Sequence, residues 1–349
     1  MLFQSFFVGI VALPAVLAGE PRRPIKGPGR HNGTAHWHHN GTVHWHPNGT
    51  YPHPNGTYNG TLPHRQRFRC GTGPFSNDTK LPKIDGKDAF PDHKLAARAP
   101  IDIPLYFHVI ASSQTPSGGW ISDNTLQKQF RVIRDTFSSY GITFRWAANE
   151  TTKTVNTTWS ETLYKSDLEP EEDQPYSGRV LEMKKALRKG GNDLRALNIY
   201  FHPDIPEFAG YSSFVPLQKD RKDFISWDGI ILNSNIMPGN PATALYVGHM
   251  AVHEIGHWLG LYHTFHGGCD GEGDHVSDTA PYFNQFSIME RCDDETRNTC
   301  VDSAGPGGED LPDPVHNFMS YFDEPCMDHF TPGQKQRMEE TWNQYRVPK

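Results

Sequence analysis

The chain has 349 residues, 36% of them hydrophobic and 21% charged, and a formal net charge of −7 at pH 7. A mildly acidic chain lacks the basic excess that binding to phosphate backbones needs, so we expect no nucleic-acid partner. Beyond the first residues, no stretch is long and apolar enough to cross a bilayer, so we expect no membrane partner either.

Residues 1–18 form an apolar segment that is too short to span a bilayer. The pattern predicts a secretory signal peptide that is cleaved after Ala18, although no Lys or Arg precedes the apolar run. Asn-x-Ser/Thr acceptors, which are glycosylated in exported proteins, agree with this prediction. The eight acceptors are Asn32, Asn40, Asn48, Asn55, Asn59, Asn77, Asn149 and Asn156. We therefore expect a secreted, extracellular glycoprotein.

Residues 19–65 contain five Asn-Gly-Thr repeats and eight histidines, with few aliphatic side chains. Such a segment cannot offset the entropy that is lost on ordering, so we predict a disordered, glycosylated spacer. Clustered imidazoles also bind zinc, copper or nickel, and metal capture is the alternative function for this segment. Residues 66–99 have the composition of a linker or pro-segment, with Cys70 near its start and a candidate processing point near Arg98.

Residues 100–349 have a globular composition and are long enough for one sizeable core that is divided by a cleft. The apolar patterns predict strands at 103–110, 142–146, 154–159, 197–201 and 229–233, and helices at 123–140 and 180–188. This alternation indicates an α+β fold whose upper part ends near His257. The remainder is rich in Gly, Pro and Asp, which predicts an irregular lower part that closes with a helix at 332–345.

His253, His257 and His263 have the spacing of metal ligands. Residues four apart lie on one face of a helix, so His253 and His257 can direct their ring nitrogens at one zinc ion. Gly260 can adopt the positive φ that ends a helix, which would return His263 to the metal as a third ligand. Three protein ligands leave one position for water, whose pKa zinc lowers to about 7, and Glu254 lies beside that face as a general base. The pattern indicates a catalytic zinc site.

The segment His253–His263 carries the longer pattern HExxHxxGxxH of the metzincin metallopeptidases, which this chain resembles. Asn317–Tyr321 resembles the methionine turn of metzincins, in which Met319 would lie beneath the three histidines. The stretch Gly267-Gly268-Cys269 and the residues around Met319 are similar to the pappalysin family, in particular to its secreted fungal members. This resemblance implies a metzincin catalytic domain: a mixed twisted sheet, two long helices above the cleft, and an irregular, disulfide-tied lower subdomain with a C-terminal helix.

The resemblance also implies an activity, that of a zinc-dependent metalloendopeptidase with protein or peptide substrates, which we expect to be a monomer. One of the predicted strands would form the sheet edge above the cleft, to which an extended peptide adds through main-chain hydrogen bonds. Several metzincin families carry a tyrosine two residues past the methionine that reaches the metal or the oxyanion, which gives Tyr321 a catalytic role. A buried tyrosine with a satisfied hydroxyl is the alternative.

Two other functions stay open at this point. One is a secreted, His-rich metal-binding glycoprotein with an inactive protease-like domain, and the other is a zinc hydrolase that acts on something other than peptides. The intact Glu254 disfavours the first, because decayed enzymes commonly lose the base. The methionine turn and the three-histidine motif disfavour the second.

Five cysteines in an exported chain predict two disulfides and one remaining thiol. The four that follow the zinc motif allow three pairings, of which the family pattern implies Cys269–Cys300 and Cys292–Cys326. The fifth is Cys70, whose Arg-Cys-Gly context resembles the cysteine switch of latent metzincins. In such a switch a thiolate takes the open zinc position and displaces water. A cysteine that is unpaired, or bonded to another molecule, is the alternative.

An acidic segment between residues 269 and 330 contains fifteen Asp or Glu residues and two Arg residues. Hard oxygen ligands suit Ca²⁺, and pappalysin-like enzymes resemble this arrangement. The candidate calcium ligands are Glu272, Asp274, Asp278 and Thr279. Acidic surface loops commonly bind nothing, which is the alternative interpretation.

Overall fold

The computed structural model divides the chain into two compact units, Met1–Arg65 and Gln66–Lys349. The residues that the structure describes are 33–37, 43–47, 69–72, 100–168, 178–240, 245–269, 273–284, 291–294, 296–301 and 311–348. The predicted signal peptide and the processing point near Arg98 lie outside them. The same is true of the acceptors Asn32, Asn40, Asn48, Asn55, Asn59 and Asn77.

The first unit contains two short strands within the Asn-Gly-Thr repeat. Strands β1 (Gly33–Trp37) and β2 (Val43–Pro47) pair in antiparallel fashion. The sequence predicts no ordered structure in this repeat, so the two strands differ from that prediction. Their Thr, Val and Trp residues are types that favour strands, which is a local preference that the overall composition of the repeat conceals.

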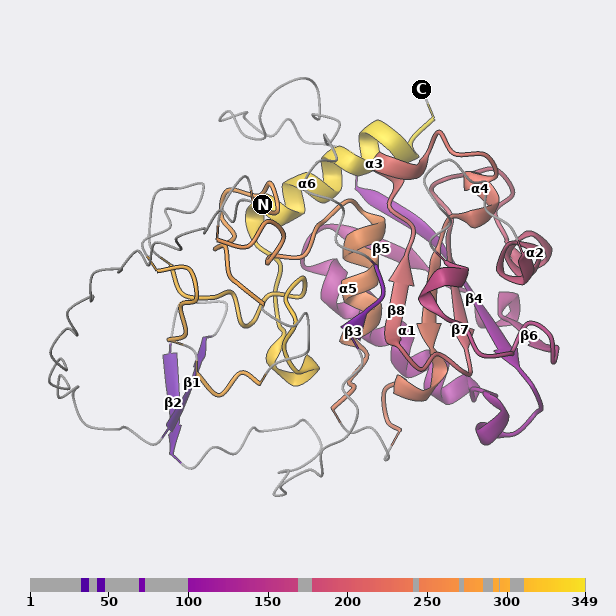
Figure 1. The fold of residues 1–349 in the computed structure, drawn as a ribbon, viewed down its shortest axis with the longest axis horizontal. Helices are drawn as coiled ribbons and strands as arrows, with labels where there is room; N and C mark the ends of the chain where they lie inside the picture. Colours follow the sequence, from indigo (N-terminus) through magenta and orange to yellow (C-terminus); the bar gives the residue numbers. More distant parts are fainter. Residues whose placement is uncertain are drawn as a thin grey trace, which may run out of the picture. The chain divides into compact units, whose positions relative to one another are not determined.

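The second unit is built on a mixed seven-stranded sheet (Figure 1). Its strands are β3 (Arg69–Cys70), β4 (Ile101–Ala111), β5 (Ile142–Arg145), β6 (Thr152–Val155), β7 (Leu197–His202), β8 (Phe208–Ser212) and β9 (Ile230–Asn233). The order is β3-β8-β9-β7-β4-β5, and β6 also pairs with β4. All pairings between β4, β5, β6, β7 and β9 are parallel, whereas β8 runs antiparallel to β9, and β3 runs parallel to β8.

Helices cover both faces of this sheet. They are α1 (Asp123–Ser138), α2 (Gly178–Leu187), α3 (Val215–Gln218), α4 (Phe224–Trp227), α5 (His249–Trp258) and α6 (Pro332–Thr341), followed by a π-helical turn, Trp342–Arg346. Helices α1 and α5 share one core with the inward side chains of β4, whereas α2 and α4 pack with Tyr200 and Ile231 on the opposite face. Among the described residues, no helix has both the length and the apolar character needed to cross a bilayer.

Most predicted elements lie within a few residues of the observed ones, but two strands do not follow the prediction. The strand expected at 154–159 is β6 at 152–155, because Asn156 starts a turn in which its Oδ1 accepts a hydrogen bond from Trp159 N at 3.0 Å. The strand beside α5 is β8, which the sequence patterns did not indicate. At this end of the sheet lies β3, which pairs with β8, and neither strand is among those predicted. The position of the edge above the cleft stays a prediction.

The region after α5 has little regular structure and is cross-linked by two disulfides, Cys269–Cys300 and Cys292–Cys326. These are the pairs that the family resemblance implies. Helix α6 closes the region. It begins with a capping box: the Thr331 hydroxyl accepts from Gln334 N, and the Gln334 side chain accepts from Thr331 N. Pro332 lies in its first turn.

Candidate active site

Helix α5 carries His253 and His257 one turn apart, and the chain reverses directly after it. Gly260 has a φ of +93°, and Leu261 N donates to Gly256 O at 2.9 Å, so the helix ends in a left-handed turn. A Cβ at residue 260 would also lie 2.2 Å from Thr341 Oγ1, so only glycine fits here. The turn brings His263 back beside the helix, as the sequence spacing predicts.

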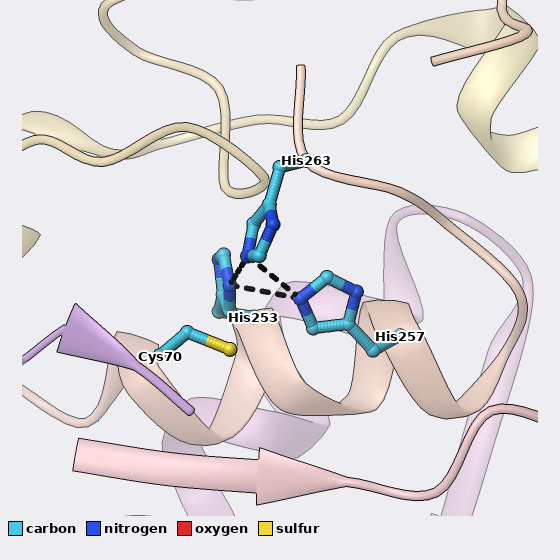
Figure 2. Close-up of side chains that lie close together, drawn as sticks. All are labelled: Cys70, His253, His257 and His263. Atoms are coloured by element: carbon cyan, nitrogen blue, oxygen red, sulfur yellow. Dashed lines mark hydrogen bonds between the residues drawn. The ribbon is translucent and has the colours of Figure 1, made fainter. Parts of the chain in front are cut away.

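The three imidazoles converge on one point (Figure 2). The Nε2–Nε2 distances are 3.1 Å between His253 and His257, 3.0 Å between His257 and His263, and 3.2 Å between His263 and His253. His253 Nδ1 lies 2.6 Å from Phe318 O, and His257 Nδ1 lies 2.8 Å from Leu261 O. A carbonyl oxygen only accepts, so these two Nδ1 atoms carry the protons and the two Nε2 atoms present lone pairs.

Lone pairs that face one another repel unless a cation lies between them, so the donor set fits a divalent metal such as zinc. Burial lowers the pKa of His253 to about 4 and holds the pKa values of His257 and His263 well below their usual value. The imidazoles are therefore neutral at pH 7, as metal ligands must be.

Glu254 is fully buried beside the imidazoles and faces β8. Its Oε2 accepts a hydrogen bond from Thr72 Oγ1 at 3.1 Å, whereas its Oε1 has no hydrogen-bond partner among the described residues. A Cβ at Gly210 would lie 2.7 Å from Glu254 Cγ, so the glycine in β8 makes room for the carboxylate. Burial raises the pKa of Glu254 to about 8, and the neighbouring Cys70 and Thr72 side chains oppose that rise.

The methionine turn lies beneath the imidazoles. Met319 is fully buried, and its N donates to Asn317 Oδ1 at 2.9 Å. The Asn317 amide in turn pairs with the buried Gln334 amide through two hydrogen bonds, at 2.7 and 3.0 Å. The Tyr321 ring lies 4.7 Å from the His263 ring, centroid to centroid, so the tyrosine packs against this imidazole.

The segment Cys70–Thr72 lies against this site although it precedes it by more than 180 residues. The Cys70 Sγ and the three histidine nitrogens all lie within 4.8 Å of one another (Figure 2). Gly71 N donates to Gly210 O at 2.7 Å, and Ser212 N donates to Thr72 Oγ1 at 2.9 Å. Burial and the nearby Glu254 raise the pKa of the Cys70 thiol well above its usual value.

Tyr321 also meets this segment, because its hydroxyl donates to Cys70 O at 3.1 Å. Each group with a predicted catalytic role therefore faces one group of the segment: the imidazoles face the thiol, Glu254 faces the Thr72 hydroxyl, and Tyr321 faces a carbonyl. Nothing in the sequence marks Thr72 for this contact. For Gly210, the glycine within an aromatic stretch is a weak signal for a strand that something approaches closely.

The candidate calcium ligands are only partly brought together. Asp274 Oδ1 accepts from Thr279 Oγ1 at 2.7 Å and from Val276 N at 3.0 Å, and its buried Oδ2 has no hydrogen-bond partner among the described residues. Asp278 instead accepts from Thr331 Oγ1 at 2.6 Å and from Gly333 N at 2.8 Å, at the start of α6. Glu272 lies outside the described residues.

Two of the predicted glycosylation acceptors lie within the described part of the chain. Asn149 is exposed in a short 3-10 helix, Ala148–Glu150, where its side chain is accessible. Asn156 is half-buried, and its Oδ1 accepts from Trp159 N, which leaves the Nδ2 atom that glycosylation modifies outside that bond.

Comparisons with known proteins agree with this site. A model of the M43 peptidases, described as Pregnancy-associated plasma protein-A, matches residues 218–343. Extracellular metalloprotease 1 of Coccidioides posadasii is 36% identical over 298 residues, which cover 84% of this chain and 96% of that protein. An extracellular metalloprotease of Colletotrichum graminicola is 39% identical over 253 residues, which cover 72% of this chain and 80% of that protein.

Among solved structures, a promirolysin of Tannerella forsythia shares the fold, with a TM-score of 0.51 at 23% identity over 71% of this chain and 82% of that chain. The fold is thus that of a metzincin-like metalloprotease, with a mixed sheet and a disulfide-tied C-terminal region. On its similarity to the fungal relatives and on the matching family model, this chain belongs to the pappalysin family of metalloproteases.

Proposed function

We propose that the chain is a secreted zinc endopeptidase that is made as a latent precursor. The observation that carries this proposal is the convergence of three neutral imidazoles beside a buried carboxylate, Glu254. His253, His257 and His263 would hold the metal. Zinc, when bound there, supplies Lewis acidity toward both water and the scissile carbonyl.

Glu254 is assigned the general-base role. Its carboxylate takes a proton from the attacking water and passes it to the leaving amine, a task that needs a base within hydrogen-bond reach of the reacting atoms. Oε1 has no protein partner to compete for that proton among the described residues. Gly210 keeps β8 close to the carboxylate, so a peptide that pairs with β8 passes directly over it.

Tyr321 is assigned to the oxyanion. Its hydroxyl already donates to a main-chain carbonyl, Cys70 O, which supports the assignment because a substrate carbonyl offers the same acceptor. The alternative is a structural tyrosine whose hydroxyl is permanently hydrogen-bonded. The contact with Cys70 O supports this alternative less well, because removal of the pro-segment would leave the hydroxyl without that acceptor.

Latency is assigned to Cys70. The thiol lies where a fourth metal ligand would lie, and β3 pairs with the strand that a substrate would use. A metal cation deprotonates a coordinating thiol, which offsets the effect of burial on its pKa. Export is supported by the predicted signal peptide, by the disulfides, and by relatives that are named extracellular metalloproteases. The proposal also includes a monomeric protein.

The test uses the purified protein after removal of the pro-segment. Glu254→Gln keeps the shape of the side chain but cannot accept the proton, so peptide cleavage should fall by about 10²- to 10⁴-fold while the zinc content stays at one per chain. Glu182→Gln, on the exposed side of α2, is the matched control and should cleave normally. Cleavage by Glu254→Gln at the parental rate would overturn the assignment. A wild-type protein that binds zinc and cleaves no member of a peptide library would favour the metal-binding glycoprotein instead.

A further inference from the structure

The helix that carries two of the metal ligands has no cap of its own. The N-terminal N–H groups of a helix lack intrahelical partners, and a Ser, Thr, Asp or Asn side chain usually accepts from them. In α5 the N-cap residue is Gly248, which has a φ of +102° and no side chain. The donors at this end are buried or half-buried, so water does not replace the missing cap.

One distant carboxylate accepts from four consecutive N–H groups at this end. Glu324 Oε2 accepts from Val247 N at 2.7 Å, Gly248 N at 2.9 Å and His249 N at 2.8 Å, and Oε1 accepts from Met250 N at 3.0 Å. The side chain is 1% exposed. Three N–H donors on one oxygen need an acceptor with several lone pairs and a negative charge, which a carboxylate provides.

The segment that carries Glu324 is joined to the methionine turn. His316 Nδ1 donates to Cys326 O at 2.6 Å, Asp328 N donates to His316 O at 2.9 Å, and Phe318 N donates to His329 O at 3.0 Å. The Cys292–Cys326 disulfide fixes the same segment. These contacts join the backbone around Glu324 to the methionine turn.

Both ends of this connection act on the metal ligands. Glu324 holds the first turn of α5, and Phe318 O orients His253 through the 2.6 Å contact to Nδ1. The position of α5 along its axis decides whether His253 reaches that carbonyl and His263 at the same time, because both of these partners lie outside the helix. A movement of α5 by a fraction of an ångström spoils one of these contacts.

We propose that Glu324 is a positioning residue for the metal site. Its carboxylate sets the position of α5 relative to the methionine turn, and so fixes the geometry of His253, His257 and His263 without contact to metal or substrate. This inference rests on the proposed function only for the activity readout. The coordination readouts below do not depend on peptide cleavage.

The test compares Glu324→Gln with Glu324→Asp and with Thr331→Ala. The Gln side chain places an NH₂ group against backbone N–H donors, whereas Asp keeps the charge on a shorter side chain. Thr331→Ala removes the N-cap of α6 and the Thr331 bond to Asp278, and so reports the effect of lost hydrogen bonds at a helix without proposed metal ligands. Each protein is loaded with Co²⁺ for its visible absorption spectrum, and zinc affinity is measured against a chromophoric chelator.

Glu324→Gln should bind zinc at least about tenfold more weakly, with an altered cobalt spectrum and a kcat lowered by about tenfold at a nearly unchanged KM. Glu324→Asp should give intermediate values of the same quantities, and it decides the matter if the Gln variant fails to fold. Thr331→Ala should lower the Tm and leave the cobalt spectrum unchanged. A destabilised Glu324 variant with the parental spectrum and zinc affinity would overturn the proposal. If the wild-type protein cleaves no peptide, the proposed function fails while these coordination measurements still decide the role of Glu324.

Discussion

Gly256 lies directly above Met319, with no space for a side chain between them: a Cβ on Gly256 would lie 2.4 Å from the methionine sulfur. Gly256 is in the middle of α5, between His253 and His257, where glycine is otherwise a poor choice. The absence of a side chain lets the helix pack directly on Met319. These two residues therefore fix how closely α5 approaches the methionine turn.

We predict that Gly256→Ala destabilises the protein. Alanine favours the helix by about 1 kcal/mol over glycine, but overpacking a full core costs about 1–3 kcal/mol, and the second effect wins because Met319 is fully buried. Urea denaturation of the metal-free protein measures the loss. The control is a double-mutant cycle with Met319→Ala: the double variant should cost less than the sum of the single changes, and strictly additive costs would contradict the contact.

The convergence of the three histidines was predictable from the sequence because their spacing is local. His253, Glu254, His257 and Gly260 lie within two turns of chain, where helical periodicity decides which side chains share a face. The disulfide pairs are different: the residues alone allowed three pairings, and only the family resemblance selected the observed one. Strand β4 and helix α1 were also found, because their apolar patterns are long and regular.

The groups that surround the three histidines and Glu254 were not predictable, because they come from distant parts of the chain. Thr72 contacts Glu254 across 182 residues, and Glu324 contacts α5 across about 75 residues. A single threonine or glutamate has no periodicity that indicates such a partner. Strand β8 was missed for a related reason: all five of its residues are buried and one is Gly210, so neither the alternation nor the composition of a strand is present.

The Thr72 hydroxyl should be a second restraint on the precursor, separate from the Cys70 thiol. Thr72→Val keeps the volume but loses the hydrogen bonds to Glu254 and from Ser212 N. A hydrogen bond contributes about 0.5–1.5 kcal/mol, and this change removes two, so the unprocessed variant should show roughly fivefold or more residual peptide cleavage over the wild-type precursor.

Fluorogenic-peptide assays on the unprocessed proteins check this. The processed enzymes are the control, since neither retains residue 72 and both should have the same kcat/KM. Combining Thr72→Val with Cys70→Ser should raise cleavage beyond either change alone; no further rise would place both residues in a single restraint.

Calcium binding stays a prediction, and Asp274 is the residue that tests it. Its buried Oδ2 lacks a hydrogen-bond partner among the described residues, and burial raises the pKa of this carboxyl to about 7. A bound Ca²⁺ would satisfy the oxygen. At a hundredfold excess over its Kd, one such ion stabilises the folded protein by about 2.7 kcal/mol.

Thermal melts with added Ca²⁺ should therefore show an increase in Tm that Asp274→Asn abolishes and that the exposed control Asp294→Asn retains. Addition of a calcium-selective chelator should lower activity, with rescue by Ca²⁺ and not by Zn²⁺. A Tm that is the same with and without Ca²⁺ rules the site out.

His202 should make the fold sensitive to acid. It is buried on β7, with Nε2 at 2.9 Å from Trp159 O and Nδ1 accepting from Asp204 N at 3.2 Å, which defines the neutral form. Burial lowers its pKa from 6.5 to about 4. The folded-state pKa is below the unfolded one, so protonation of His202 favours the unfolded state. The contribution of the neutral His202 to stability is therefore complete above pH 6.5 and is lost as the pH falls toward 4.

His202→Gln keeps a donor for Trp159 O and cannot titrate. The free energy of unfolding of the wild type should fall relative to this variant between pH 6.5 and 4, by a total of about 3 kcal/mol. Urea denaturation at a series of pH values measures the difference, in which the metal-site histidines cancel because both proteins carry them. Parallel stability curves over this pH range would show that the histidine has no such effect.

Strand β8 has β9 on one side and the two-residue β3 on the other. When β3 leaves, the N–H and C=O groups that it covered form an open sheet edge, and open edges pair with any extended chain that is available. The edge that we propose admits a peptide for hydrolysis would thus also be a template for aggregation between copies of the chain. Keeping β3 in place protects the colloidal stability of a concentrated precursor, and an enzyme stored after processing should be kept dilute or supplied with a peptide ligand.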